Sequence, residues 1–446
     1  MSKRASNPIW SGAALFGALL LSGCAIYHRK PLPMTPDLMR SPALTVPVDK
    51  LDLPGLKPHP IPTNGLDETA IVTLAVLNDP DLKAARLQAG VADAQVLEAG
   101  LLPDPQVSGG LSQSPEHTGY SIGLGEDIQA LITRGAAKAA AKARARQVRL
   151  DILWQEWQVA GQARETFIQL RADQRLLALL EPFQKLLAGI CGKDQAALAR
   201  NDVTIGAASS DLRSLAGVEA NLRQTQLDAN QGRHVLAALL GLEPDAPVPL
   251  AGAGRDHLLT QAQFGAALAA LPRRRADLLA LQAGYESQEQ SLREAILAQF
   301  PAISAGVQQA RSAEEGVHSI GFTVNVTLPL FNRNRGRIAI QRATRALLYQ
   351  TWQARLDQAA SQADQLWRAS RIMAARLHDL EIHASDTKTG ISAADRDYRA
   401  GNLSASEYLA LVSDWQAEQM QEIQLRASLE QAEAAVRTIL GLPFEP

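Results

Sequence analysis

Apolar and polar residues alternate strictly in one segment of the second half of the chain. The apolar positions are Ile320, Phe322, Val324, Val326 and Leu328. The residues that alternate with them, at every second position from Ser319 to Thr327, are Ser, Gly, Thr or Asn. Successive side chains of a strand point to opposite faces, so this period of two predicts a strand over about 318–328 with one apolar and one polar face. A partner strand is expected over about 301–311, because only a short polar segment separates the two.

A second hairpin of the same kind is predicted earlier in the chain, with strands over about 105–112 and 119–128. Each hairpin is followed by a long segment in which apolar residues recur in steps of three and four. In the second half this seam runs from Leu348 to Tyr398, and in the first half from Leu150 to Ile190. Such spacing is typical of helices that pack as a coiled coil. A helix of roughly 65–70 residues would be about 100 Å long.

Four short matches in the same order show that the chain contains two copies of one sequence unit. The matching segments are Leu87–Gly90 with Leu281–Gly284, Pro105–Gly110 with Pro301–Gly306, Ser121–Gly123 with Ser319–Gly321, and Leu240–Leu242 with Leu440–Leu442. The spacing between the copies stays within 194 to 200 residues, so their order and distance are both kept. We interpret residues 70–242 as repeat 1, residues 243–263 as a linker and residues 264–442 as repeat 2. The expected fold class is mainly α with a small β part.

The N-terminal segment predicts export and a lipid anchor. Lys3 and Arg4 precede a short apolar run, Ala13–Leu21, which suits a signal peptide and is too short for a membrane-spanning helix. The run leads into Leu-Ser-Gly-Cys, which resembles a bacterial lipobox, so residues 1–23 are expected to be removed and Cys24 to carry lipid. Ala25 follows Cys24 where Asp would resemble an inner-membrane retention signal. Residues 24–66 are rich in proline and are expected to form an extended tether.

Charge and cysteine content exclude some functions and partners. Two of the 44 Lys and Arg residues lie in the signal peptide and none of the 46 Asp and Glu residues does, so the mature chain has a net charge of about −4. A nucleic-acid partner is therefore not expected, because no basic excess exists to neutralise phosphates. With Cys24 committed to lipid, Cys191 has no disulfide partner within the chain and is interpreted as a small helix residue.

No catalytic motif is present. The sequence lacks His-Glu-x-x-His and the phosphate-binding Gly-x-x-x-x-Gly-Lys pattern. Its Gly-x-Ser-x-Gly match, Gly119–Gly123, lies inside a predicted strand and not at the strand-to-helix turn that a nucleophile elbow requires. His117 and His318 lie near the hairpin loops and are interpreted as solvated residues rather than metal ligands. The chain is not expected to be an enzyme or to need a cofactor or resident metal.

Four strands cannot close a barrel, because about eight are needed even for one filled with side chains. Three copies of the chain would supply twelve strands around a lumen lined by the polar face. Their long helices would form an α-helical barrel that continues the pore. The pattern therefore predicts a trimeric conduit that runs from the outer membrane into the periplasm.

The tandem repeat, the paired hairpins, the Leu-Gly-Leu repeat ends and the segment Leu328–Gly336 at the strand-to-helix junction resemble the TolC-type outer-membrane efflux proteins. The lipobox is similar to that of their lipoprotein members, and the junction segment to the CzcC-like heavy-metal cation efflux branch. This resemblance implies a homotrimer in the outer membrane that docks on a periplasmic adaptor protein and an inner-membrane resistance-nodulation-division pump. The chain would be a passive exit duct for heavy-metal cations or small toxic compounds.

The resemblance also implies a function for the turns at the helix ends. The family pattern Gly-x-x-Ser/Thr-x-x-acid is matched by Gly401, Ser404 and Glu407, with Tyr398 just upstream. Glu407 then becomes a candidate for the entrance gate, where three copies would form a cation-favouring ring. Its alternative interpretation is a capping partner of Ser404, three residues before it.

Repeat 1 matches the tip pattern more loosely, with Gly206 and Asp211 present but two residues further apart and Ala208 in place of the hydroxyl. Gly206, Asp211, Tyr398, Gly401 and Ser404 are the expected adaptor contacts. Two other classes of protein stay open at this point. One is the outer-membrane conduit of a type I protein secretion system, and the other is a structural periplasmic coiled-coil lipoprotein, which would not explain the two hairpins.

Overall fold

A computed structural model describes residues 27–41, 65–115, 118–202, 204–252, 258–313 and 317–443. The chain divides into two compact units, Met1–Leu38 and Met39–Pro446. In the first unit, the described residues 27–38 are exposed and contain no helix or strand. The signal peptide, Cys24 and most of the predicted tether lie outside the described residues.

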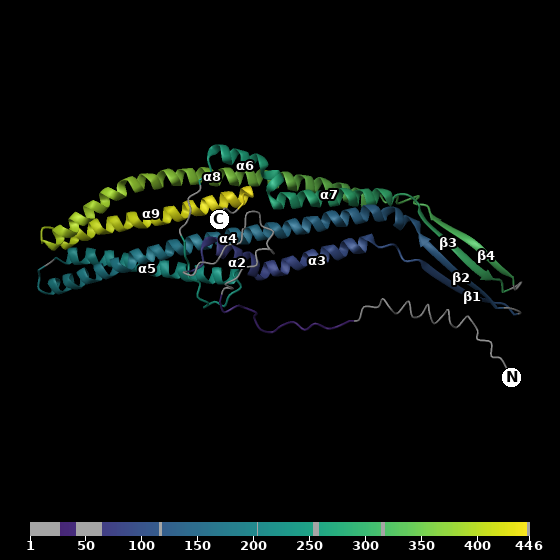
Figure 1. Cartoon of the computed structure of the whole chain (residues 1–446), viewed down its shortest axis with the longest axis horizontal. Helices are drawn as coiled ribbons and strands as arrows, with labels where there is room; N and C mark the ends of the chain where they lie inside the picture. Colours follow the sequence, from purple (N-terminus) through teal and green to yellow (C-terminus); the bar gives the residue numbers. More distant parts are fainter. Residues whose placement is uncertain are drawn as a thin grey trace, which may run out of the picture. The chain divides into compact units, whose positions relative to one another are not determined.

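The second unit contains the two repeats, and each follows the order helix, helix, strand, strand, helix, helix (Figure 1). Repeat 1 consists of α2 (Glu68–Asn78), α3 (Pro80–Gly100), β1 (Gln106–Gln113), β2 (Thr118–Asp127), α4 (Ile128–Ala199) and α5 (Ile205–Leu239). Repeat 2 consists of α6 (Gln261–Arg274), α7 (Ala276–Leu297), β3 (Ala302–Arg311), β4 (His318–Thr327), α8 (Arg335–Arg399) and α9 (Ala405–Leu440). Each strand begins and ends within one residue of the range that the alternation predicts.

The four strands form one antiparallel sheet in the order β1-β2-β3-β4. The two hairpins of the repeats join through β2 and β3, so the centre of the sheet is also the contact between repeats. Within this unit the sheet lies at one end of the long helices, and the α4–α5 and α8–α9 turns lie at the other (Figure 1).

The long helices pack along seams of small and large apolar residues. In α8, Ala359, Ala363, Leu377 and Leu380 are buried at positions of the predicted heptad. The helix α4 has 72 residues, which corresponds to about 108 Å at 1.5 Å per residue. It continues through Pro182 without ending. None of the helices in the described ranges is both long and apolar enough to cross a membrane.

Short helices cover the middle of the long ones in each repeat. In repeat 1, Ile71 and Leu74 of α2 pack in one core with Phe167 of α4 and Leu236 of α5. In repeat 2, the ring of Phe264 stacks on that of Trp367, with centroids 4.7 Å apart. Complete burial of a side chain such as Leu74 or Phe167 stabilises the folded state by roughly 1.5–3 kcal/mol. The repeat therefore supplies two similar cores along the unit.

Candidate functional site

One face of the sheet is apolar and exposed along its whole width. A single row of cross-strand partners, one from each strand, joins Val107, Leu124, Val307 and Phe322. All four side chains are exposed, and that of Phe322 is 87% exposed. A contiguous apolar surface of this kind is rare on a protein surrounded by water and marks a surface that contacts protein or lipid.

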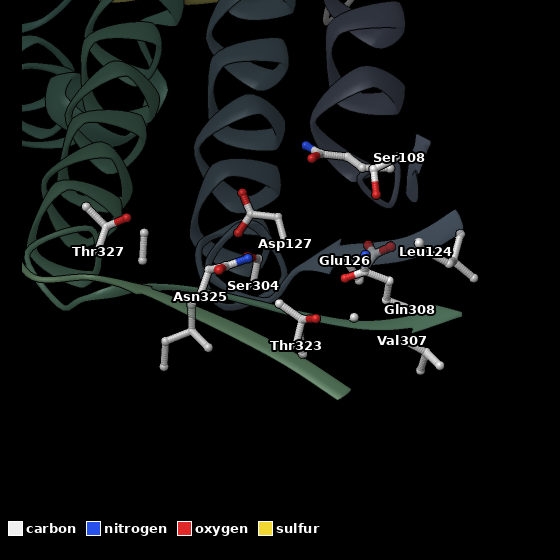
Figure 2. A pocket seen from close by; sticks show the side chains of 17 residues that line it. Ser108, Leu124, Glu126, Asp127, Ser304, Val307, Gln308, Thr323, Asn325 and Thr327 are labelled. Atoms are coloured by element: carbon white, nitrogen blue, oxygen red, sulfur yellow. The ribbon is translucent and has the colours of Figure 1, made fainter. Parts of the chain in front are cut away.

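The opposite face of the sheet is polar and concave. It lines a hollow of about 430 Å³ to which every strand contributes. Figure 2 shows Ser108, Ser304, Thr323, Asn325 and Thr327 around it, together with the carboxylate of Asp127 at the end where β2 enters α4. Uncharged hydroxyl, amide and glycine positions dominate this face, so water and small solutes can lie against it.

Both outer strands of the sheet have an unpaired edge. Within the described residues, β1 pairs only with β2 and β4 pairs only with β3. An exposed edge presents free backbone N–H and C=O groups that readily pair with another strand. A sheet with an apolar face and two open edges is thus incomplete as a single chain.

At the far end of the helices, the α8–α9 turn brings together all four residues that the sequence pattern identifies there. Gly401 has φ +78°, a conformation that side chains with a Cβ rarely adopt, and it reverses the chain. Ser404 is the N-cap of α9 and forms a capping box with Glu407. The ring of Tyr398 stacks on that of Tyr408, with centroids 4.5 Å apart.

Glu407 is exposed and tied to the start of α9. Its carboxylate accepts hydrogen bonds from the hydroxyl of Ser404 at 2.6 Å and from the backbone N–H of Ser404 at 3.1 Å. These bonds hold the pKa of Glu407 below its ordinary value, so the carboxylate stays charged at neutral pH. The capping interpretation therefore describes a contact that exists, and the charge of Glu407 stays exposed to solvent.

Gly206 and Asp211 lie in the first two turns of α5, just after the α4–α5 turn. Gly206 is the second residue of α5 and is exposed, whereas Asp211 is buried. The two turns belong to the same end of the unit, because Ile190 of α4, Val218 of α5, Ala394 of α8 and Tyr408 of α9 lie in one apolar cluster. The structure therefore brings the tip residues of both repeats to one end of a four-helix bundle.

Asp211 has a raised pKa of about 6. Burial is the largest cause, followed by a hydrogen bond with Asp194 of α4 and the negative charge of that residue. Burial and Asp211 also raise the pKa of the nearby Cys191 thiol. An acid whose pKa rises on folding favours the folded state at low pH and loses that stabilisation as pH rises through the folded value.

We therefore expect the α4–α5 tip to loosen as pH rises from about 4 to 6 and to change little above that range. Hydrogen exchange of the tip amides, corrected for intrinsic rates, measures this. Asp211→Asn mimics the protonated acid and should remove the pH dependence. Asp228→Asn, a control on the same helix, should leave it. An unchanged pH dependence in Asp211→Asn would show that Asp211 does not control the tip.

Two residues at this end are not in the sequence-predicted site. Asp395 accepts a hydrogen bond from the hydroxyl of Tyr408 at 3.3 Å and forms an ion pair with Arg399. The spacing of four between Asp395 and Arg399 is a signal that sequence reasoning could have used. Asp194 gives no such signal, since its contact with Asp211 depends on the packing of α4 against α5. Within the described residues, no three His, Cys, Asp or Glu side chains are grouped to hold a metal ion.

Three solved structures share this fold across nearly the whole chain. A membrane protein from Pseudomonas aeruginosa matches with a TM-score of 0.73 and 16% identity, covering 94% of this chain and 98% of that one. The Campylobacter jejuni CmeC outer membrane channel matches with a TM-score of 0.70 and 13% identity, covering 95% of this chain and 96% of that one. The open state of the Neisseria gonorrhoeae MtrE outer membrane channel matches with a TM-score of 0.68 and 14% identity, covering 94% of this chain and 98% of that one.

No curated protein matches the sequence. The family model described as outer membrane efflux protein matches residues 267–442. This segment contains nearly all of repeat 2, including the hairpin β3–β4 and the α8–α9 turn. Residues 267–442 therefore belong to the outer membrane efflux protein family, and the chain as a whole has the fold of the outer-membrane channels.

Proposed function

We propose that three copies of this chain form an exit duct in the outer membrane, which passes substrates delivered by an inner-membrane pump and a periplasmic adaptor. The two-faced sheet with open edges is the observation that carries this proposal. Pairing β4 of one copy with β1 of the next would close twelve strands. The apolar face would then contact lipid and the hollow polar face would line the pore.

The helices support the same assembly. The helix α4 extends about 108 Å from the sheet, far beyond the roughly 30 Å thickness of a bilayer's hydrocarbon core. Three four-helix bundles would continue the pore into the periplasm, and the two turns at their ends would meet the adaptor. Heavy-metal cations or small toxic compounds are the proposed substrates. The pump, rather than the polar lining of the duct, would select among them.

Deletion of the gene that encodes this chain in its own host tests this function. Cells without the protein should become more sensitive to some members of a panel of heavy-metal salts and small toxic compounds. Expression of the protein from a plasmid should restore resistance. Unchanged sensitivity to the whole panel, combined with loss of a secreted protein, would favour the type I secretion conduit instead.

The gate proposal for Glu407 can be separated from its capping contact. Glu407→Gln removes the charge and keeps the side-chain type that a capping box accepts. In single-channel recordings this variant should lose cation preference, because three negative charges leave the entrance, while trimers still form. Asp414→Ala, which removes an exposed acid about two turns further along α9, is the control. Unchanged selectivity in Glu407→Gln would leave Glu407 as a capping residue only.

Lipid anchoring is proposed from the Leu-Ser-Gly-Cys segment alone. We expect the mature N-terminus to be Cys24 carrying a diacylglyceryl group, which intact-mass and peptide mass spectrometry detect directly. Cys24→Ser should remove the lipid mass and still permit assembly, since the apolar sheet face itself has affinity for the membrane. Recovery of an intact signal peptide or an unmodified Cys24 would contradict the anchor.

A further inference from the structure

Three side chains with polar groups lie side by side at the loop end of the apolar sheet face. Tyr120 of β2 is directly opposite Arg311 of β3, and Arg311 is directly opposite His318 of β4. Directly opposed residues share a face, and two-residue steps along β4 place His318 on the same face as Ile320 and Phe322. A polar cluster that contains one arginine therefore ends a face on which Gln309 is the next residue of β3 and apolar residues predominate beyond it.

Arg311 carries an unused hydrogen-bond donor. Its Nε is buried and has no hydrogen-bond partner, and no ion pair involves Arg311 among the described residues. Beside it, the hydroxyl of Tyr120 lies 3.5 Å from Nδ1 of His318, and the centroids of the two rings are 6.1 Å apart. A guanidinium that has no carboxylate partner among the described residues is suited to an external anion, and its planar fork matches the oxygens of a phosphate.

The position of the cluster corresponds to a membrane boundary. Arg311 is nine residues from Ala302, which lies at the helix end of β3. At about 3.4 Å per residue and a tilt near 40°, this separation is roughly 23 Å along the membrane normal, close to the height of an apolar band. Arginine on a lipid-facing surface is costly at the midplane and tolerated near the boundary. The end of the sheet with the β1–β2 and β3–β4 loops lies away from the helices that are proposed to enter the periplasm. This boundary would therefore be the one at the outer leaflet.

We propose that Arg311, flanked by Tyr120 and His318, binds the phosphate of an outer-leaflet lipid headgroup. This inference rests on the proposed function, because it requires the apolar face to contact lipid. The guanidinium would donate to two phosphate oxygens, and the Tyr120 hydroxyl is placed to donate to a third. Edge pairing between copies would not cover Arg311 and Tyr120, since they belong to the two central strands. Lipid rather than a second copy is therefore the occupant.

The test uses full-length protein in phosphatidylcholine vesicles that contain a small fraction of bisphosphorylated lipid A. Native mass spectrometry after detergent release counts the lipid A molecules that the protein retains. Arg311→Gln should lower the affinity for lipid A about tenfold or more, because charge-assisted hydrogen bonds to the phosphate are lost. Arg311→Lys should lower it less, because the charge stays while the fork is lost. Arg342→Gln, at an exposed arginine of α8, is the control and should retain lipid A as the wild type does.

Dephosphorylated lipid A should show no difference between the wild type and Arg311→Gln. Equal retention of bisphosphorylated lipid A by these two proteins would overturn the proposal. Inorganic phosphate that displaces lipid A completely at millimolar concentration would also overturn it, by showing a site for the free ion. A wild-type chain that does not enter the vesicles would contradict the proposed function itself and this site with it.

Discussion

Arginine in place of Phe322 is expected to destabilise the folded protein in membranes by roughly 2–4 kcal/mol, because a charged side chain would replace an apolar one near the middle of the face that we propose contacts lipid. Val324→Arg should have a similar effect, since Val324 lies two residues away on the same face. Urea titration of protein folded into vesicles measures the free energy of unfolding of each variant.

The neighbouring polar positions provide matched controls on the same strand. Thr323 and Asn325 line the hollow face, so Thr323→Arg and Asn325→Arg should change the free energy of unfolding far less and should alter ion conductance instead. If arginine is equally costly on both faces, the assignment of one face to lipid and the other to a pore is wrong.

Loss of the Asp277 carboxylate is expected to be the most destabilising single change among the buried polar residues. Asp277 contacts Arg275 at 2.7 Å and Arg355 of α8 at 2.8 Å, and both Asp277 and Arg275 are buried. The guanidinium of Arg275 also lies 4.5 Å from the ring centroid of Trp154 in α4. Asp277→Ala would leave two cations without their anion, at a cost of about 3–5 kcal/mol.

Thermal or urea unfolding of Asp277→Ala in detergent measures this loss. Asp364→Ala is a suitable control, because its ion pair with Arg368 lies within one turn of α8 and is exposed. Such surface pairs contribute about 0–1 kcal/mol. Similar stabilities for Asp277→Ala and Asp364→Ala would show that the buried ion pairs do not hold α7 against α8.

The sequence predicts the features of this protein that depend on local periodicity. The alternation around Phe322 gives β4 and its two faces, and the heptad from Leu348 to Tyr398 gives most of α8. The Ser404–Glu407 spacing gives the capping box at the start of α9. In each case the side chains that interact are close in sequence, so the pattern itself carries the geometry.

Contacts between distant segments could not be predicted in the same way. Arg355 reaches Asp277 across 78 positions of sequence, and no local pattern indicates this contact. The pairing of β2 with β3 determines that Arg311 lies beside Tyr120, although the two belong to different repeats. The carboxyl pair of Asp194 and Asp211 likewise depends on how α4 packs against α5. These contacts are set by tertiary packing, which the one-dimensional pattern does not encode.

Cysteine cross-linking between the two edge strands tests the trimeric duct most directly. One cysteine replaces Ser108 of β1, and Ser319, Thr323 or Asn325 of β4 is replaced in turn to sample the register, in a chain with Cys191→Ser. Strands β1 and β4 lie at opposite edges of the sheet, so a disulfide between them requires two chains. After oxidation of intact cells, at least one pair should give covalent products that end at three chains. Ladders that continue beyond three chains, or no cross-link at any of these pairs, would contradict the account.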